Sequence, residues 1–289
     1  MNKTQHEYFV TRYSLIPDAQ IDIETASGVT KEEKFMNWLN SFSEINKKET
    51  TYRNTNYVLY CKKRSDNCFI LSFGKALKDS VGEKTETGII DTTISNYKKC
   101  TILFNIPRQW ILIQKNSAIA SDIEQQKNLI SRVITQFLND YHLVFSIDLI
   151  TQKRHFWEYI KANKDSITEI EITLSSPNFL RGIKTVTDIL HQTNDIYNNT
   201  SIGVQLQNTE GHLTINEDNE FLKDAIKYSS AGGGKWKVKS STDQIYKSTD
   251  NPYIINLPSD LYEEFENEEN QDFIKDAFSE VKNYDVEVD

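Results

Sequence analysis

Glu169-Ile170-Glu171-Ile172-Thr173-Leu174 opens the stretch, residues 169–238, on which our interpretation of the fold depends. Apolar and polar residues alternate here with a period of two, which is typical of a half-buried strand. A break at Pro177 follows, and we then expect a helix (179–191), a strand (201–207), a second helix (220–228) and another strand after Gly234. Strands that alternate with helices predict an α/β or α+β unit with its own sheet.

The chain before this stretch predicts a lobe of a different kind. Residues 8–16, 57–61, 68–73, 88–95, 100–104 and 109–114 have strand patterns, and an amphipathic helix is expected at 31–43. The longest expected helix, 121–141, is long enough to link two lobes. We therefore predict an α+β protein with a β-rich N-terminal lobe (1–117), a connecting helix (118–142), an α/β-type C-terminal lobe (143–258) and an acidic C-terminal segment (259–289).

The charge of the chain is concentrated at its end. The net charge of the 289 residues is −9, and residues 259–289 contain twelve acidic and two basic side chains. The body is therefore almost neutral and can carry basic faces. Two hypotheses follow for the acidic segment: it competes with phosphates for basic side chains, or it is a solvated tail that only aids solubility.

The compartment follows from two further observations. No apolar run approaches the length of a membrane-spanning helix, and the N-terminus has no uninterrupted apolar signal segment. Cys61, Cys68 and Cys100 have no metal-like spacing, so we interpret them as reduced thiols on strands. We expect a cytoplasmic protein.

The lysines that follow the three glycines are candidates for binding phosphate groups. In Gly234-Lys235-Trp236-Lys237-Val238-Lys239 the alternation places three lysines on one side of a strand and the apolar residues on the other. Beside a glycine loop with exposed N–H groups, such lysines suit phosphate contact. The alternative is an ordinary hairpin turn with a solvated lysine face. A GxxxxGK[ST] phosphate-binding loop is excluded, because no glycine stands at the required earlier position.

Other basic residues form small clusters. Each cluster alone is typical of a solubilising surface, but together they are compatible with nucleic-acid binding. The candidate nucleic-acid-binding residues are Lys62, Lys63, Arg64, Arg181, Lys184, Lys235, Lys237 and Lys239.

The sequence contains no motif that is specific for one type of catalytic reaction. The five histidines are scattered, and neither HExxH nor GxSxG occurs. Asp148, Glu169 and Glu171 are conceivable nuclease carboxylates, but a single Glu-x-Glu on a strand is usually a solvent-facing edge. We expect a binding protein with no catalytic residues, metal site or cofactor.

The order of elements resembles the RexA family of phage-exclusion proteins. The residues that carry the resemblance are 8–13, 35–40, 55–60, 101–104 and, above all, 170–174 with the helix that contains Arg181, Lys184 and Leu190. The resemblance spans most of residues 8–215. It implies a two-lobed dimer that binds double-stranded DNA with little sequence specificity and acts in abortive infection with a membrane-protein partner. The alternative is a protein-interaction or inhibitory module whose acidic segment binds a basic partner.

Overall fold

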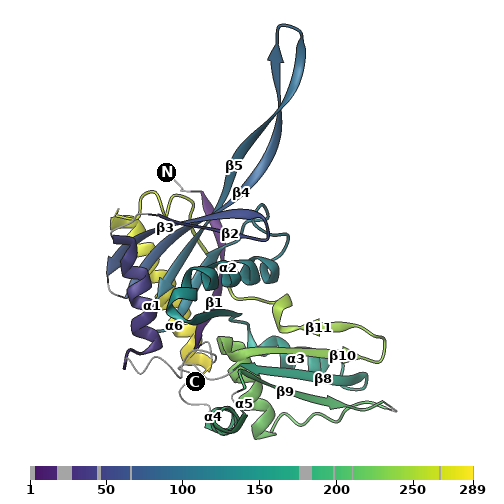
Figure 1. Cartoon of the computed structure of the whole chain (residues 1–289). Helices are drawn as coiled ribbons and strands as arrows, with labels where there is room; N and C mark the ends of the chain where they lie inside the picture. The colour runs from purple at the N-terminus through teal and green to yellow at the C-terminus, as the bar shows by residue number, and fades with distance from the viewer. Residues whose placement is uncertain are drawn as a thin grey trace.

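The chain folds into two antiparallel β-sheets with helices packed on them (Figure 1). The prediction of an α+β protein is confirmed. The structure is a computed structural model. It describes residues 4–17, 28–43, 47–65, 67–175, 184–197, 199–209, 211–266 and 268–288.

The large sheet has eight strands, in the order β12-β1-β6-β5-β4-β3-β2, and β1 also pairs with β7. Its strands are β1 (Gln5–Pro17), β2 (Lys47–Tyr52), β3 (Thr55–Ser65), β4 (Cys68–Thr85), β5 (Gly88–Asn105), β6 (Trp110–Gln114), β7 (Leu143–Leu149) and β12 (Ile254–Pro258). The first residues of β1 pair with β12, its middle pairs with β6 and its end pairs with β7. Residues 143–149 and 254–258 thus belong to the large sheet, whereas the sequence assigned them to the C-terminal lobe. The physical reason is that β12 pairs with only residues 5–9 of β1, so β7 pairs with residues 11–17 along the same side of β1, opposite β6.

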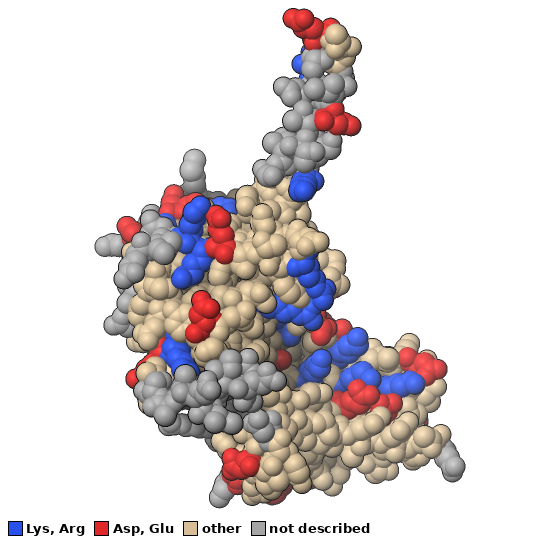
Figure 2. Space-filling model, viewed as in Figure 1, with Lys and Arg blue, Asp and Glu red and all other residues tan. Residues whose placement is uncertain are grey.

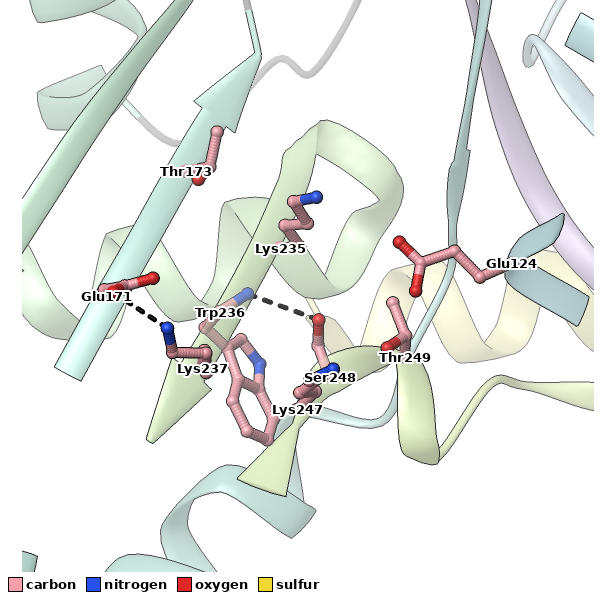
Figure 3. Close-up of a pocket in the computed structure, with 9 residues that line it drawn as sticks. All are labelled: Glu124, Glu171, Thr173, Lys235, Trp236, Lys237, Lys247, Ser248 and Thr249. Carbon is pink, nitrogen blue, oxygen red and sulfur yellow. Dashed lines mark hydrogen bonds and ion pairs between the residues drawn. The ribbon is translucent and has the colours of Figure 1, made fainter. Parts of the chain in front are cut away.

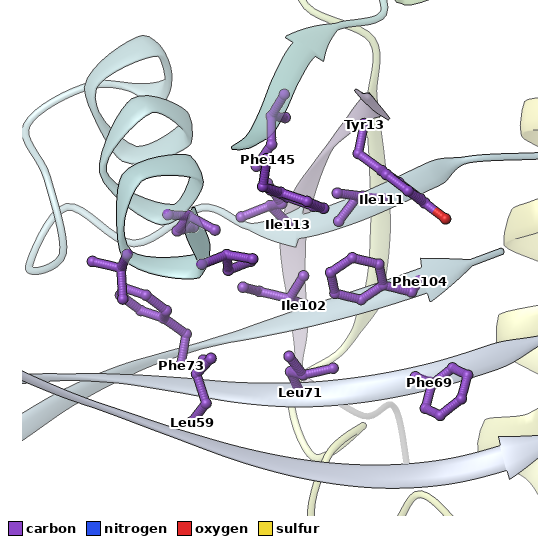
Figure 4. Packing of buried hydrophobic residues seen from close by; sticks show 14 of the residues in the cluster. Tyr13, Leu59, Phe69, Leu71, Phe73, Ile102, Phe104, Ile111, Ile113 and Phe145 are labelled. Carbon is purple, nitrogen blue, oxygen red and sulfur yellow. The ribbon is translucent and has the colours of Figure 1, made fainter. Parts of the chain in front are cut away.

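Helices cover both faces of the large sheet. In front lie α1 (Lys31–Asn40), which begins at the capping box of Thr30 and Glu33, and α2 (Ile123–Leu138) (Figure 1). Aromatic rings fill the core beneath them; Tyr13 stacks on Phe145 with 5.4 Å between ring centroids (Figure 4). Such a pair adds about 0.5–1.5 kcal/mol beyond the burial of its area.

Helix α2 covers the outer edge of β7, although the sequence predicted a linker there. Lys127 Nζ donates a hydrogen bond of 2.9 Å to the carbonyl of Ile147, and Ser131 Oγ donates one to the carbonyl of Phe145. The hydroxyl of Thr135 accepts a hydrogen bond of 3.0 Å from the N–H of Phe145. Side chains one helical turn apart therefore satisfy edge groups that would otherwise be unpaired.

The acidic C-terminal segment is neither a tether nor a solvated tail. It contains α6 (Glu268–Val288), which lies behind the large sheet (Figure 1). Its buried apolar side chains pack in one cluster with residues of β1, β4, β5 and β6; they are Leu261, Phe265, Ile274, Ala277 and Val281. The acidic residues occupy the remaining positions. The segment is therefore amphipathic, with an apolar side that packs on the sheet and an acidic side that does not.

A long hairpin arm leaves the large sheet. Strands β4 and β5 stay paired from Cys68 and Asn105 to Thr85 and Gly88, and the far part of the hairpin extends beyond the rest of the molecule (Figure 1). The sequence predicted the strands on either side but not the continuation of β4 through residues 75–85, because these residues are too polar to show a buried strand pattern.

The small sheet has the order β11-β10-β8-β9. Its strands are β8 (Ile167–Ser175), β9 (Ser201–Gln207), β10 (Gly234–Ser240) and β11 (Ile245–Lys247), and α3 (Lys153–Ala162), α4 (Lys184–Tyr197) and α5 (Glu220–Tyr228) accompany it. The helices pack against one face, where Ile170, Ile172, Trp236 and Val238 are buried. The other face carries polar and charged side chains and is open.

Candidate functional site

The glycine-rich segment is a buried junction and not an exposed loop. Ser229–Gly233 is a π-helical turn that leads from α5 into β10, and Ser229 and Ser230 are 0% exposed. The carbonyl of Ala231 accepts a hydrogen bond of 2.7 Å from Arg12 Nε of β1. The prediction of exposed backbone N–H groups for phosphate is therefore wrong, as is the alternative of a hairpin turn. The segment joins the two sheets.

The strand after the junction has the predicted alternation. Trp236 and Val238 are buried among the helices, whereas Lys235, Lys237 and Lys239 lie on the open face of the small sheet. Two of the three lysines already have acidic partners. Lys237 Nζ lies 2.8 Å from Glu171, and Lys239 Nζ lies 2.8 Å from Asp243.

Lys235 lines a pocket of about 220 Å³ (Figure 3). The pocket also contains Lys247 of β11, and the backbone N–H of Trp236 donates a hydrogen bond of 3.2 Å to Ser248 Oγ at its edge. Within the described part of the chain, neither Lys235 nor Lys247 forms an ion pair. Two available ammonium groups and several hydroxyls, from Thr173, Ser248 and Thr249, give the pocket the chemistry of a phosphate contact.

Two carboxylates limit the positive charge of this pocket. Glu124, in the first turn of α2, lines it from the large-sheet side. Glu171 lines it from β8, and its hydrogen bond to Lys237 lowers the pKa of the Glu171 carboxyl. Glu171 is therefore ionised at neutral pH and neutralises Lys237.

A second, wider pocket of about 630 Å³ lies beside the first turns of α2. Arg53, Lys75 and Arg132 line it, together with Gln125 and Asn128 of α2. Lys75 Nζ donates a hydrogen bond of 2.8 Å to the carbonyl of Ile119, while the guanidinium of Arg53 stacks 5.4 Å from the ring centroid of Tyr52. These contacts hold the cations in place without neutralising them.

The two pockets form one basic surface. Figure 2 shows Lys and Arg side chains on both walls of the hollow between the two sheets, with Asp and Glu among them. We call this surface the basic hollow and define it by Arg53, Lys75 and Arg132 on one wall and Lys235, Lys237 and Lys247 on the other. Sequence analysis missed Arg53, Lys75, Arg132 and Lys247. The signal for Lys247 is its register opposite Lys237, which appears only once β10 and β11 are paired.

Lys62 does not belong to the basic hollow. Its Nζ donates hydrogen bonds to the carbonyls of Tyr262 (3.0 Å) and Glu263 (3.3 Å) and lies 4.9 Å from the centroid of the Tyr262 ring. Lys62 thus fastens the C-terminal segment to β3. Lys63 and Arg64 follow it on β3, but their side chains lie outside the described residues, as do Arg181 and the side chain of Lys184. Of the eight predicted residues, the structure brings together Lys235, Lys237 and Lys239 on one strand.

Asp148 of β7, which is half-buried, interacts electrostatically with the buried Lys127 of α2. Burial raises the pKa of Asp148. The positive charge of Lys127 acts against this shift, and so does a hydrogen bond of 3.4 Å from Ser175 Oγ, because both favour the carboxylate. Burial lowers the pKa of Lys127, and Asp148 acts against this shift. Lys235 adds to the positive field at both groups, which places its charge near this pair.

Three further observations bear on function. In the ranges that the structure describes, no group of three or more His, Cys, Asp or Glu side chains is arranged to hold a metal ion. No described helix combines the length and the apolar character needed to cross a membrane. No protein-family model matches the chain, and no curated protein matches it either.

Proposed function

We propose that this protein binds duplex DNA through the basic hollow, with little sequence specificity and without catalysis. The observation that carries the proposal is that cationic side chains from the small sheet and from the large sheet with its helix α2 line one hollow, and that Lys235 and Lys247 have no ion-pair partner within the described residues. The resemblance to the RexA family supports a role in anti-phage defence by abortive infection, in the cytoplasm and with a membrane-protein partner.

The chemistry of the hollow favours phosphates over bases. Lysine ammonium groups act as point charges, and serine and threonine hydroxyls donate single hydrogen bonds, so these groups contact the DNA backbone without reading sequence. Lys237 contributes less than its neighbours because Glu171 already pairs with it. Each phosphate contact made by Lys235 or Lys247 releases a counterion, which makes the affinity strongly dependent on salt.

The experiment measures binding of the full chain to two labelled duplexes of unrelated sequence over a series of KCl concentrations. Equal affinity for both duplexes and a linear fall of log K with log[KCl] are expected. The double variant Lys235→Ala/Lys247→Ala should lower the magnitude of the slope by up to about 1.8, since each lost phosphate contact contributes about 0.9. Lys275→Ala is the matched control, because Lys275 lies on α6 and pairs with Asp272. No binding, or the same slope for parent and double variant, would refute the proposal.

A protein partner with a basic surface is the second candidate. The observation that favours it is the row of exposed carboxylates outside the packed face of the C-terminal segment, which includes Glu266, Asp276 and Glu280. Poly-lysine serves as the probe. If the chain binds poly-lysine but neither duplex, and Asp276→Lys/Glu280→Lys abolishes that binding, the second candidate replaces the first.

A further inference from the structure

Strand β9 is an open edge of the small sheet. It is the last strand of the order β11-β10-β8-β9 and pairs only with β8 among the described residues. Its seven residues, Ser-Ile-Gly-Val-Gln-Leu-Gln, include neither a charged side chain nor a proline. An uncharged edge strand of this length offers unpaired N–H and C=O groups to another strand.

Apart from the two-stranded arm of β4 and β5, the outer strands at the other edges of the two sheets are protected within the described part of the chain. Side chains of α2 bond to the outer edge of β7. Strand β2 carries Lys47, Lys48 and Glu49, β12 ends at Pro258, and β11 has only three residues, of which Lys247 is one. Charges, proline, shortness and a covering helix are the usual means of preventing edge-to-edge pairing. The contrast singles out β9.

The sequence of β9 is complementary to itself. Ile202, Val204 and Leu206 stand opposite Leu174, Ile172 and Ile170 of β8 and share the helix-covered face of the sheet. They are placed symmetrically about Val204, so an antiparallel copy of β9 centred there sets apolar residues against apolar residues at every position on the helix-covered face. A second copy of this chain fits this pattern without any other partner being required.

The helix layer next to β9 is also incomplete. Leu206 is 43% exposed, although it lies on the face that α4 and α5 cover elsewhere. At the end of α4, just before β9, Ile196 is 70% exposed and Tyr197 is 74% exposed. Exposed large apolar side chains beside both ends of an open edge strand are typical of an interface.

We propose that β9 pairs antiparallel with β9 of a second copy, around a two-fold axis that passes through Val204. The two small sheets then form one continuous sheet, in which Val204 faces the partner's Val204 and Ile202 faces the partner's Leu206. The contact is isologous and closes on itself, as in most homodimers. Because the axis of such an antiparallel pair is perpendicular to the sheet, both open faces, with Lys235 and Lys237 of each copy, lie on the same side of the dimer.

The first test is the mass of the full chain in solution, measured without DNA by sedimentation equilibrium. The parent is expected to be a dimer and Leu206→Lys a monomer at the same concentration, since the substitution sets a charge among the apolar residues of the contact. Ile245→Lys is the matched control: Ile245 is 49% exposed and lies on β11, the opposite edge of the same sheet, so this variant should remain a dimer. If Leu206→Lys fails to fold by circular dichroism, Val204→Lys takes its place, because the two lysines would stand directly opposite each other across the two-fold axis.

The second test fixes the register. Residues directly opposite each other in an antiparallel pair have Cα atoms about 4.5–5.5 Å apart, which is within the range that a disulfide spans. Val204→Cys should therefore form a disulfide-linked dimer under mild oxidation, whereas the parent, which keeps its three native cysteines, and Ile245→Cys should not. A monomeric parent, a Leu206→Lys or Val204→Lys dimer, or the absence of a Val204→Cys crosslink would overturn the proposal. All these readouts are obtained without DNA, so they are independent of the proposed function.

Discussion

Gly232 packs directly on Arg12: a Cβ atom added to Gly232 would stand 2.7 Å from the Cβ of Arg12. Gly232 also has a φ of +84°, a conformation that side chains with a Cβ rarely adopt. This close approach lets Arg12 Nε reach the carbonyl of Ala231, and a second hydrogen bond of 2.9 Å runs from Arg12 Nη1 to the carbonyl of Arg108. One glycine and one arginine thus connect β1 of the large sheet to the segment that leads into β10 of the small sheet.

Gly232→Ala should destabilise the fold. The left-handed conformation alone costs about 1–2 kcal/mol for an alanine, and the contact with Arg12 adds to this, so we expect the free energy of unfolding to fall by about 2 kcal/mol or more. Urea unfolding at one protein concentration measures the change. Gly203→Ala is the control, because nothing lies within 4 Å of a Cβ at Gly203. Equal losses in both variants would contradict the role given to the junction.

Much of this fold is predictable from local patterns. The alternation at Lys235–Lys239 correctly predicted which side chains of β10 are buried and which lie on the open face, because this depends only on the two-residue period of a strand. Pairing partners are not local, and the same pattern in residues 143–149 does not say that they pair with β1. The glycines illustrate a third limit: Gly232 signals a special backbone conformation, but the sequence does not distinguish an exposed loop from a buried junction.

The candidate site was predicted only in part for a related reason. Lys235 and Lys237 were found because they are neighbours on one strand. Arg53 and Arg132 come from a turn and from a helix, and they meet only when α2 has packed on the large sheet. A surface assembled from distant segments leaves no cluster in the sequence, whereas the cluster that does appear there, at residues 62–64, includes Lys62, which bonds to the C-terminal segment.

The ionisation of Asp148 should lower the free energy of unfolding as the pH rises. Burial raises its pKa, so the folded chain holds the proton more tightly than the unfolded chain does. Stability is then greatest below the unfolded pKa, near 3.8, and falls as the pH rises through the folded pKa. Asp148→Asn stays neutral, so its stability relative to the parent, measured by urea unfolding, should increase as the pH rises from about 4 through the folded pKa of Asp148. Asp243→Asn is the control, because Lys239 lowers the pKa of Asp243 and the variant should show no such gain. A constant difference for Asp148→Asn would refute this account.

Glu171→Gln should raise the affinity for duplex DNA. The substitution removes the carboxylate that lies 2.8 Å from Lys237 and leaves the ammonium group available for a phosphate. The magnitude of the salt slope should increase by about 0.9, the contribution of one phosphate contact. Asp272→Asn releases Lys275 on α6 in the same way and is the matched control, for which no change is expected. An equal rise in both variants would show that total charge, and not the basic hollow, determines binding.

Removal of residues 259–289 should unfold the large sheet and not strengthen DNA binding. Leu261, Phe265 and Ile274 are buried against the face of this sheet, and deleting them exposes that face to water. Loss of one such side chain costs about 2–5 kcal/mol, so loss of the whole segment exceeds the stability of an ordinary domain. The test that keeps the fold is Glu263→Gln, which removes the ion pair with Lys99 while leaving the apolar contacts intact. Its DNA affinity should equal that of the parent, because Lys99 does not line the basic hollow. A folded truncated chain with higher DNA affinity than the parent would restore the hypothesis that the acidic segment competes with phosphates.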